Sequence, residues 1–271
     1  MSRVWISPLL LAIACASSAA EPPKVAPQQV ASRPEASEEV LRGERLLVNG
    51  RVSEARRIFE QALADNEEDA RAWLDLGLTH EAAGNLRAAR DAYQRATEVD
   101  PAFAEAFNNL GVLERESGEL DRAVLTLERA VELDPDLTAA RFNLGLCYEE
   151  LSRIEDAERE YQATIEQTPG DPVPRINLAM MYLAVDRPED AATQLRASVP
   201  RVRGDVLLSI AVGEGLRRAG LAEEAVPVLR DALEVAGDPP PTELLAELAL
   251  AEYAAGDLGA AERAMARAVQ Q

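Results

Sequence analysis

Apolar residues recur at helical spacing from residue 36 onward, in segments of about 14 residues that alternate with short polar breaks. Each segment has one apolar face and one polar face, which is the pattern of an amphipathic helix. The breaks carry a small or polar residue at Gly50, Gly84, Gly118, Ser152, Asp186, Gly220 and Gly256. Glycine just past a helix end accepts the left-handed backbone conformation that a tight reversal needs. The pattern therefore predicts an all-α fold in which helices are joined in pairs by tight turns.

The helix pairs repeat at a fixed step of 34 residues. Three rows of residues keep this step: Ala55, Ala89, Ala123, Ala157, Ala191 and Ala225; Gly43, Gly77, Gly111 and Gly145, continued by Ala179 and Gly213; and Pro101, Pro135 and Pro169. The small residues let the two helices of a pair approach closely, and the prolines end the second helices. A fixed long period indicates one helical hairpin that is copied and stacked. The hairpins are expected to start near residues 36, 70, 104, 138, 172, 206 and 242, and together they form a domain over residues 36–271.

The repeat is less regular at its ends. Pro200 and Gly204 are expected to shorten the second helix of the fifth hairpin. The seventh hairpin is displaced by two residues around Pro239–Pro241, and an atypical last hairpin is expected where a stack ends. The first hairpin has Glu39 where a large apolar residue is usual.

Composition narrows the possible functions. The formal net charge is −20, and only 4% of the residues are aromatic. A surface this acidic repels phosphate backbones and anionic lipid, which argues against nucleic-acid binding. No cluster of His, Cys and carboxylate residues has metal-ligand spacing, and the sequence has neither a phosphate-binding glycine loop nor a nucleophile elbow. We therefore expect no enzyme activity, no metal, no cofactor and no small-molecule substrate, and we expect Cys147 to be a buried structural residue.

The first 35 residues differ from the rest of the chain. Residues 1–14 combine Arg3 with an apolar run too short for a transmembrane helix, which needs about 20 residues, and this length is typical of a signal peptide. Cys15 ends a stretch that resembles a bacterial lipobox, so we expect lipidation there; cleavage after Ala20 is the alternative. Residues 15–35 are rich in Pro and Ala without helical periodicity and are expected to form a disordered tether. The chain is expected to be exported, as an outer-membrane lipoprotein facing the periplasm or as a soluble periplasmic or secreted protein.

The recurring residues resemble the tetratricopeptide repeat signature. They are Trp73, Leu76, Gly77, Ala89, Tyr93, Ala96 and Pro101 in the second hairpin, Leu110, Gly111, Ala123, Ala130 and Pro135 in the third, and Leu144, Gly145, Tyr148, Ala157, Tyr161 and Pro169 in the fourth. The resemblance covers residues 36–271. It implies a right-handed superhelical solenoid of about seven helix–turn–helix hairpins, and it implies a scaffold that binds protein or peptide partners.

In this family the first helices line a concave groove, and the resemblance implies which residues face it here. One row at the 34-residue step consists of Asn109, Asn143 and Asn177, whose amides can hold an extended peptide backbone because each both donates and accepts. The apolar groove positions are Leu74, Leu78, Val112, Phe142, Leu146, Ile176, Met180 and Leu183. Some of these side chains are alternatively expected to pack against the neighbouring hairpin. We expect apolar anchors to supply most of the affinity and the asparagines to set direction and register.

The leader, the tether and the hairpins together resemble the pilotin lipoproteins of type IV pili. The stretch from Phe107 to Gly111 is similar to an Asn-Asn-aromatic-Gly stretch of that group, with Leu110 in place of the aromatic residue. This resemblance implies assistance in secretin and pilus assembly. Two alternatives remain open, which are a structural subunit of an envelope-spanning motility or secretion complex and an accessory subunit of an envelope enzyme.

Overall fold

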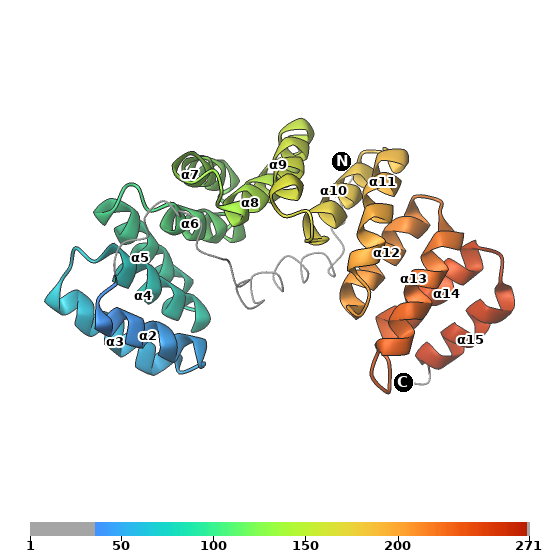
Figure 1. Ribbon diagram of the computed structural model, residues 1–271, viewed down its shortest axis with the longest axis horizontal. Helices are drawn as coiled ribbons and strands as arrows, with labels where there is room; N and C mark the ends of the chain where they lie inside the picture. Colours follow the sequence, from blue (N-terminus) through green and yellow to red (C-terminus); the bar gives the residue numbers. More distant parts are fainter. Residues whose placement is uncertain (1–35, 270–271) are drawn as a thin grey trace. The chain divides into compact units, whose positions relative to one another are not determined.

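A computed structural model of the chain describes residues 36–269 (Figure 1). Over these residues the fold is all-α and consists of 14 α-helices and one short 3-10 helix, which confirms the predicted fold class. The contacts divide the described chain into an N-terminal body that ends at Glu160 and a C-terminal body that begins at Tyr161. The predicted signal peptide (1–14), lipidated Cys15 and tether (15–35) lie outside the described residues.

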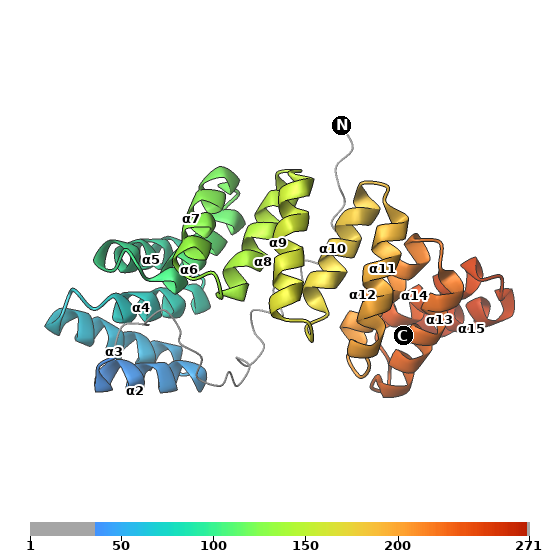
Figure 2. The same cartoon turned by 45° about the horizontal axis from the view of Figure 1, so that its top comes forward.

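The N-terminal body is built from successive antiparallel hairpins (Figure 2). Its helices are α2 (Glu38–Val48), α3 (Val52–Asp65), α4 (Ala70–Ala82), α5 (Leu86–Val99), α6 (Ala104–Glu116), α7 (Leu120–Leu133) and α8 (Thr138–Glu150), and α9 (Ile154–Gln167) spans the boundary between the bodies. Helix α2 pairs with α3, α4 with α5 and α6 with α7. Each hairpin packs on the next through α3 and α4, α5 and α6, and α7 and α8, so the core is a row of similar seams between neighbours.

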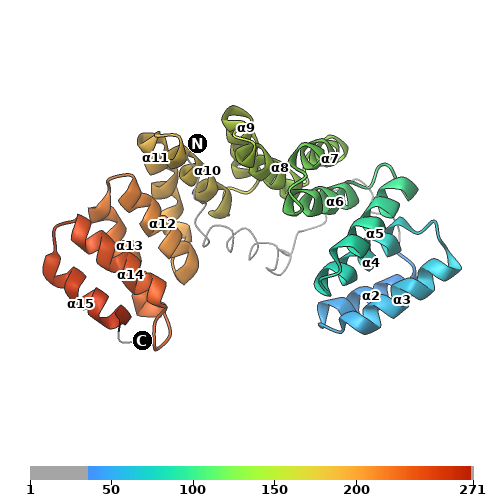
Figure 3. The same ribbon diagram turned by 180° about the vertical axis from the view of Figure 1, so that it is seen from behind.

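The C-terminal body repeats this arrangement (Figure 3). Its elements are α10 (Val173–Ala184), α11 (Pro188–Ser198), η1 (Val199–Arg201), α12 (Val206–Arg218), α13 (Ala222–Val235), α14 (Thr242–Ala254) and α15 (Leu258–Val269). Helix α11 has 11 residues whereas α13 has 14, because Pro200 and Gly204 end the fifth hairpin early, as the sequence predicts. None of the helices in the described part of the chain is long and apolar enough to span a membrane.

The tight turns inside the hairpins need a left-handed residue. All seven predicted turn residues have a positive φ, including Ser152 at 58° and Asp186 at 59°, where glycine is replaced. The prolines of the repeat act between hairpins. Helices α5, α7 and α9 end two residues before Pro101, Pro135 and Pro169.

Close approach within a hairpin depends on a small residue facing a large one. A Cβ atom added to Gly111 would lie 2.6 Å from Cγ of Leu127, and Gly77 stands in the same relation to Tyr93. Gly145 is buried, and Ala89, Ala123 and Ala157 are fully buried. We call the large residue of each second helix the anchor. The seven anchors are Phe59, Tyr93, Leu127, Tyr161, Leu195, Leu229 and Met265.

Candidate functional site

Three asparagines of the N-terminal body join α6 to α8 by their side-chain amides. Asn143 on α8 donates from Nδ2 to Oδ1 of Asn108 at 2.9 Å, and Asn108 on α6 donates from Nδ2 to Oδ1 of Asn109 at 3.0 Å. All three side chains are half-buried. We call this chain of hydrogen bonds the amide cluster. Asn109 and Asn143 hold equivalent positions of the third and fourth hairpins, whereas Asn108, which links them, has Phe142 at its equivalent position.

The amide cluster has an open donor at one end and an open acceptor at the other. A side-chain amide offers two N–H donors and an oxygen with two lone pairs. Within the described residues, neither Nδ2 of Asn109 nor Oδ1 of Asn143 has a hydrogen-bond partner. A residue in an extended segment presents the complementary pair on one edge of its backbone, because its C=O accepts and its N–H donates. Asn108 is not one of the predicted groove residues, although it directly precedes Asn109 on the same helix.

Asn177 does not join this arrangement. It lies on α10 in the C-terminal body, is only 6% exposed, and donates from Nδ2 to the backbone oxygen of Val173 on its own helix at 2.9 Å. The predicted row of three equivalent amides is therefore corrected to two, Asn109 and Asn143, which are linked through Asn108. A 34-residue step gives the position of a side chain but not its hydrogen-bond partner.

The eight predicted apolar groove residues fall into two groups. Leu78, Val112, Phe142 and Leu183 are half-buried, so part of each side chain is open to solvent. The others are buried, with exposed fractions of 9% or less: Leu74, Leu146, Ile176 and Met180. In the structure these four side chains belong to the packed interior, which corrects their predicted exposure; Leu74 is one of the core residues around the anchor Tyr93.

The first helices of the N-terminal body carry a net negative charge. Carboxylates outnumber guanidinium groups on each of α2, α4, α6 and α8. Two of the arginines are already paired across neighbouring helices, Arg71 with Glu44 and Arg115 with Glu150 at 2.7 Å. Glu116 at the end of α6 is exposed. A partner segment with basic residues next to apolar ones therefore fits this surface by charge.

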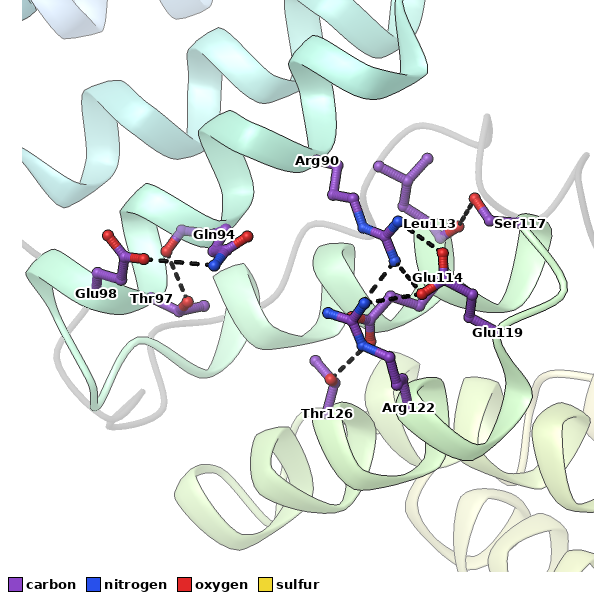
Figure 4. Close-up of polar contacts among 10 residues, drawn as sticks. All are labelled: Arg90, Gln94, Thr97, Glu98, Leu113, Glu114, Ser117, Glu119, Arg122 and Thr126. Carbon is purple, nitrogen blue, oxygen red and sulfur yellow. Dashed lines mark hydrogen bonds and ion pairs between the residues drawn. The ribbon is translucent and has the colours of Figure 1, made fainter.

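A buried carboxylate holds α6, the helix that carries two of the three amides (Figure 4). Glu114 is 1% exposed; it pairs with Arg122 of α7 at 3.0 Å and accepts from Oγ1 of Thr126 at 2.7 Å. Arg90 of α5 approaches Glu114 at 3.8 Å and pairs with Glu119 at 2.6 Å. The hydrogen bond from Arg90 lowers the pKa of Glu119, and the same bond raises the pKa of Arg90. The network joins three helices and is structural, because cations and a hydroxyl group surround the carboxylate.

Neither a metal-binding cluster nor a reactive thiol is found in the described part of the chain. No group of three or more His, Cys, Asp or Glu residues there is arranged to hold a metal ion. Cys147 is fully buried, and desolvation raises the pKa of its thiol to about 12, so it is protonated and not nucleophilic near neutral pH.

The comparison with protein families found one family. The sequence model described as tetratricopeptide repeat matches residues 40–86, 74–138 and 115–172. These overlapping ranges cover the hairpins that form the N-terminal body and reach the start of the C-terminal body. The comparison with curated proteins found no match.

Several solved structures are similar in fold. PilW, described as a widely conserved type IV pilus biogenesis factor, has a TM-score of 0.67 at 19% identity over 77% of this chain and 98% of its own. PilF of Pseudomonas aeruginosa has a TM-score of 0.64 at 16% identity over 76% of this chain and 93% of its own. YrrB, a TPR protein with an unusual peptide-binding site, has a TM-score of 0.54 at 22% identity over 64% and 89%. The family match and the repeated hairpins agree, and the chain is a member of the tetratricopeptide repeat family.

Proposed function

We propose that the protein is a non-enzymatic scaffold that binds an extended segment of a partner protein on the first-helix face of its N-terminal body. The amide cluster carries this proposal, because its free N–H at Asn109 and free oxygen at Asn143 complement the backbone C=O and N–H of an extended segment. Val112 and Phe142 lie on the same two helices and offer apolar contacts. Tetratricopeptide repeat proteins bind protein or peptide partners, and YrrB is one with a peptide-binding site.

Apolar contacts should contribute more free energy to binding than the hydrogen bonds of the amide cluster. One buried apolar anchor of Leu size contributes about 1.5–3 kcal/mol, whereas one net hydrogen bond contributes about 0.5–1.5 kcal/mol. Association itself costs roughly 4–15 kcal/mol. The amide cluster alone is therefore too weak, and a bound segment has to contact Val112, Phe142 and Leu78 as well. The carboxylates on the four first helices favour a segment with lysine or arginine.

The cell envelope is the setting that we propose for this scaffold, with pilus or secretin assembly as the narrower role. Support comes from the signal-like leader and from the fold similarity to PilW and PilF, which are pilus proteins by description or name. A structural subunit of an envelope-spanning complex is the second candidate, since stacked hairpins also suit a permanent assembly.

Replacing Asn109 and Asn143 together by Ala should weaken binding of the partner segment. Two hydrogen bonds are lost, so the affinity should fall roughly 5- to 150-fold. The full chain would be used to capture partners from solubilised envelopes, and the captured segment would then be titrated against each variant. Asn85→Ala is the matched control, because Asn85 is exposed and its side chain caps no helix. Equal affinities of the double variant and the wild type, with unchanged helicity, would remove the amide cluster from the site.

Replacing Cys15 by Ser should release the protein from membranes. The variant lacks the thiol that a lipobox cysteine uses, and without acyl chains the acidic surface gives no attraction to anionic lipid. Fractionation of cells that express either form would show the change. A Cys15→Ser protein that still sediments with membranes would contradict lipid anchoring. If the wild type in the membrane fraction and Cys15→Ser in the soluble fraction capture the same partners, lipidation anchors the protein but is not needed for partner binding.

A further inference from the structure

Each second helix presents its anchor between two small residues. The seven sets are Ala55–Phe59–Ala62, Ala89–Tyr93–Ala96, Ala123–Leu127–Ala130, Ala157–Tyr161–Thr164, Ala191–Leu195–Ser198, Ala225–Leu229–Ala232 and Ala261–Met265–Ala268. Six of the anchors are 0% exposed, whereas Met265 on α15 is 42% exposed. The pattern is the same in all seven helices, so the difference lies in what covers Met265.

An anchor is covered from two sides. The small residue of its own hairpin lies against one side, as Gly111 does against Leu127. The first helix of the following hairpin covers the other side; Leu110 and Leu113 of α6 share a core cluster with Tyr93, and Leu76 of α4 shares one with Phe59. No helix of the described chain comes after α15. Within the described residues, Met265 is therefore covered on one side only.

The neighbouring helix α14 is uncovered at the equivalent positions. We number the positions of a hairpin from its expected start, so that residues 36, 70, 104, 138, 172, 206 and 242 are position one. Side chains at positions nine and twelve contact the first helix of the next hairpin: Glu44 contacts Arg71, Arg115 contacts Glu150, and Arg217 contacts Glu247. The residues at these two positions of α14 are Leu250, 44% exposed, and Tyr253, 66% exposed. In the hairpins that are followed by another hairpin, the apolar residues at position nine are half-buried (Leu78 and Val112) or buried (Leu146 and Met180), and none of them is exposed. We call Leu250, Tyr253, Met265 and Val269 the open end.

The first helix of the chain does not fit this open end. Covering positions three, seven and ten are Ala72, Leu76 and Thr79 in α4, all buried. The same positions in α2 are Glu38, Arg42 and Arg45, all exposed. Head-to-tail stacking of two copies would bury these charges against Met265, and unpaired buried charge is strongly unfavourable. Among the described helices, α2 is the one that has no preceding hairpin, so a second copy stacked head to tail is not the occupant.

We propose that the open end binds an amphipathic helix of a partner protein, which continues the stacking of the hairpins. The pattern of that helix is taken from α14, which packs on α13 and so lies over the Ala225–Leu229–Ala232 set with Leu244, Leu248 and Ala251. The partner helix has apolar residues at one position, four positions later and three positions after that. This surface is distinct from the amide cluster and lies entirely in the C-terminal body.

The carboxylate of Glu262 on α15 favours a basic residue at one position of the partner helix. Glu262 is exposed and holds the position that Arg90 has on α5. Arg90 approaches Glu114, which directly follows the third covering position, Leu113, on the next first helix. With the charge reversed, Glu262 selects a Lys or Arg directly after the third apolar residue of the docking helix.

A peptide with the sequence of α14 tests this proposal. The probe spans residues 242–254 with Glu252→Lys, which puts a cation after the third apolar position. It is stapled at the positions of Ala246 and Leu250, on the opposite face, and carries a fluorescent label. The full chain should bind this probe, measured by fluorescence anisotropy, more tightly than the peptide with the original Glu252. Met265→Glu in the protein should weaken binding roughly 10- to 100-fold, because the anchor is lost.

Two further variants make the result decisive. Glu262→Lys should invert the preference between the two peptides, a readout that a fold defect cannot produce. Leu125→Glu is the matched control, because Leu125 is 67% exposed on α7, and should leave binding unchanged. Equal binding by wild type and Met265→Glu, or no binding at all, would overturn the proposal. So would sedimentation of the wild type as a dimer that Met265→Glu dissolves, because a second copy would then occupy the open end.

Discussion

Replacing Leu127 by Ala should lower the free energy of unfolding by about 2–5 kcal/mol. Leu127 is the anchor of α7 and is fully buried, with the backbone of Gly111 directly beneath it. Truncation removes the transfer free energy of the lost methyl and methylene groups and leaves a cavity that helices held on both sides cannot fully close. Urea unfolding of the full chain followed by circular dichroism measures the loss, and amide hydrogen exchange places it in α6 and α7.

Leu125 gives the control for this experiment. It lies two residues earlier on the same helix and is 67% exposed, so Leu125→Ala changes helix propensity and side-chain size in the same way without opening a cavity. Its effect should stay within about 0.5 kcal/mol. Similar losses for both variants would show that Leu127 is not an anchor.

Replacing Gly111 by Ala should lower the free energy of unfolding by about 1–3 kcal/mol. The added Cβ would lie 2.6 Å from Cγ of Leu127, a branch point near the stem of the side chain, so the two helices have to move apart. Ala is a better helix former than Gly by about 1 kcal/mol, so helix propensity alone would raise the free energy of unfolding. A decrease would therefore come from the close contact with Leu127. Gly170→Ala is the control, because nothing lies within 4 Å of its added Cβ and its φ is not positive.

Combining the two substitutions tests the mechanism. In the Gly111→Ala, Leu127→Ala double variant the new methyl group meets a shortened neighbour, so the combined loss should be smaller than the sum of the single losses. Residues in contact commonly show coupling of about 0.5–3 kcal/mol. Strict additivity would mean that the close approach at Gly111 does not limit how the hairpin packs.

The 34-residue period of the sequence predicts the architecture because each hairpin packs against its neighbours through the same helices. The expected starts of the hairpins lie within two residues of the first residues of α2, α4, α6, α8, α10, α12 and α14. The position of Ser152 in the step predicts a left-handed turn even though serine does not favour that backbone conformation. Pro200 and Gly204 likewise indicate the early end of α11.

The burial and the hydrogen-bond partners of the candidate site residues could be predicted less well from the sequence. Met180 and Val112 hold the same position of their hairpins, yet Met180 is 5% exposed and Val112 is half-buried, because burial also depends on how far neighbouring side chains reach. Asn109 and Asn177 are likewise equivalent by spacing, but one amide bonds to Asn108 and the other to its own helix. Met265 has the sequence context of a buried anchor, and its exposure depends on whether another helix packs against α15, which the local sequence does not encode.

The carboxylate of Glu114 also affects how the N-terminal body comes apart. If α5 separated from α6 and α7, the buried carboxylate of Glu114 would lose the neighbouring guanidinium group of Arg90. Separation at this seam is therefore more costly than fraying of α2, whose outward face consists of solvated charges. Thermal opening should begin at the first hairpin and stop before the third, which keeps the helix that carries Asn108 and Asn109 in place while the start of the body fluctuates.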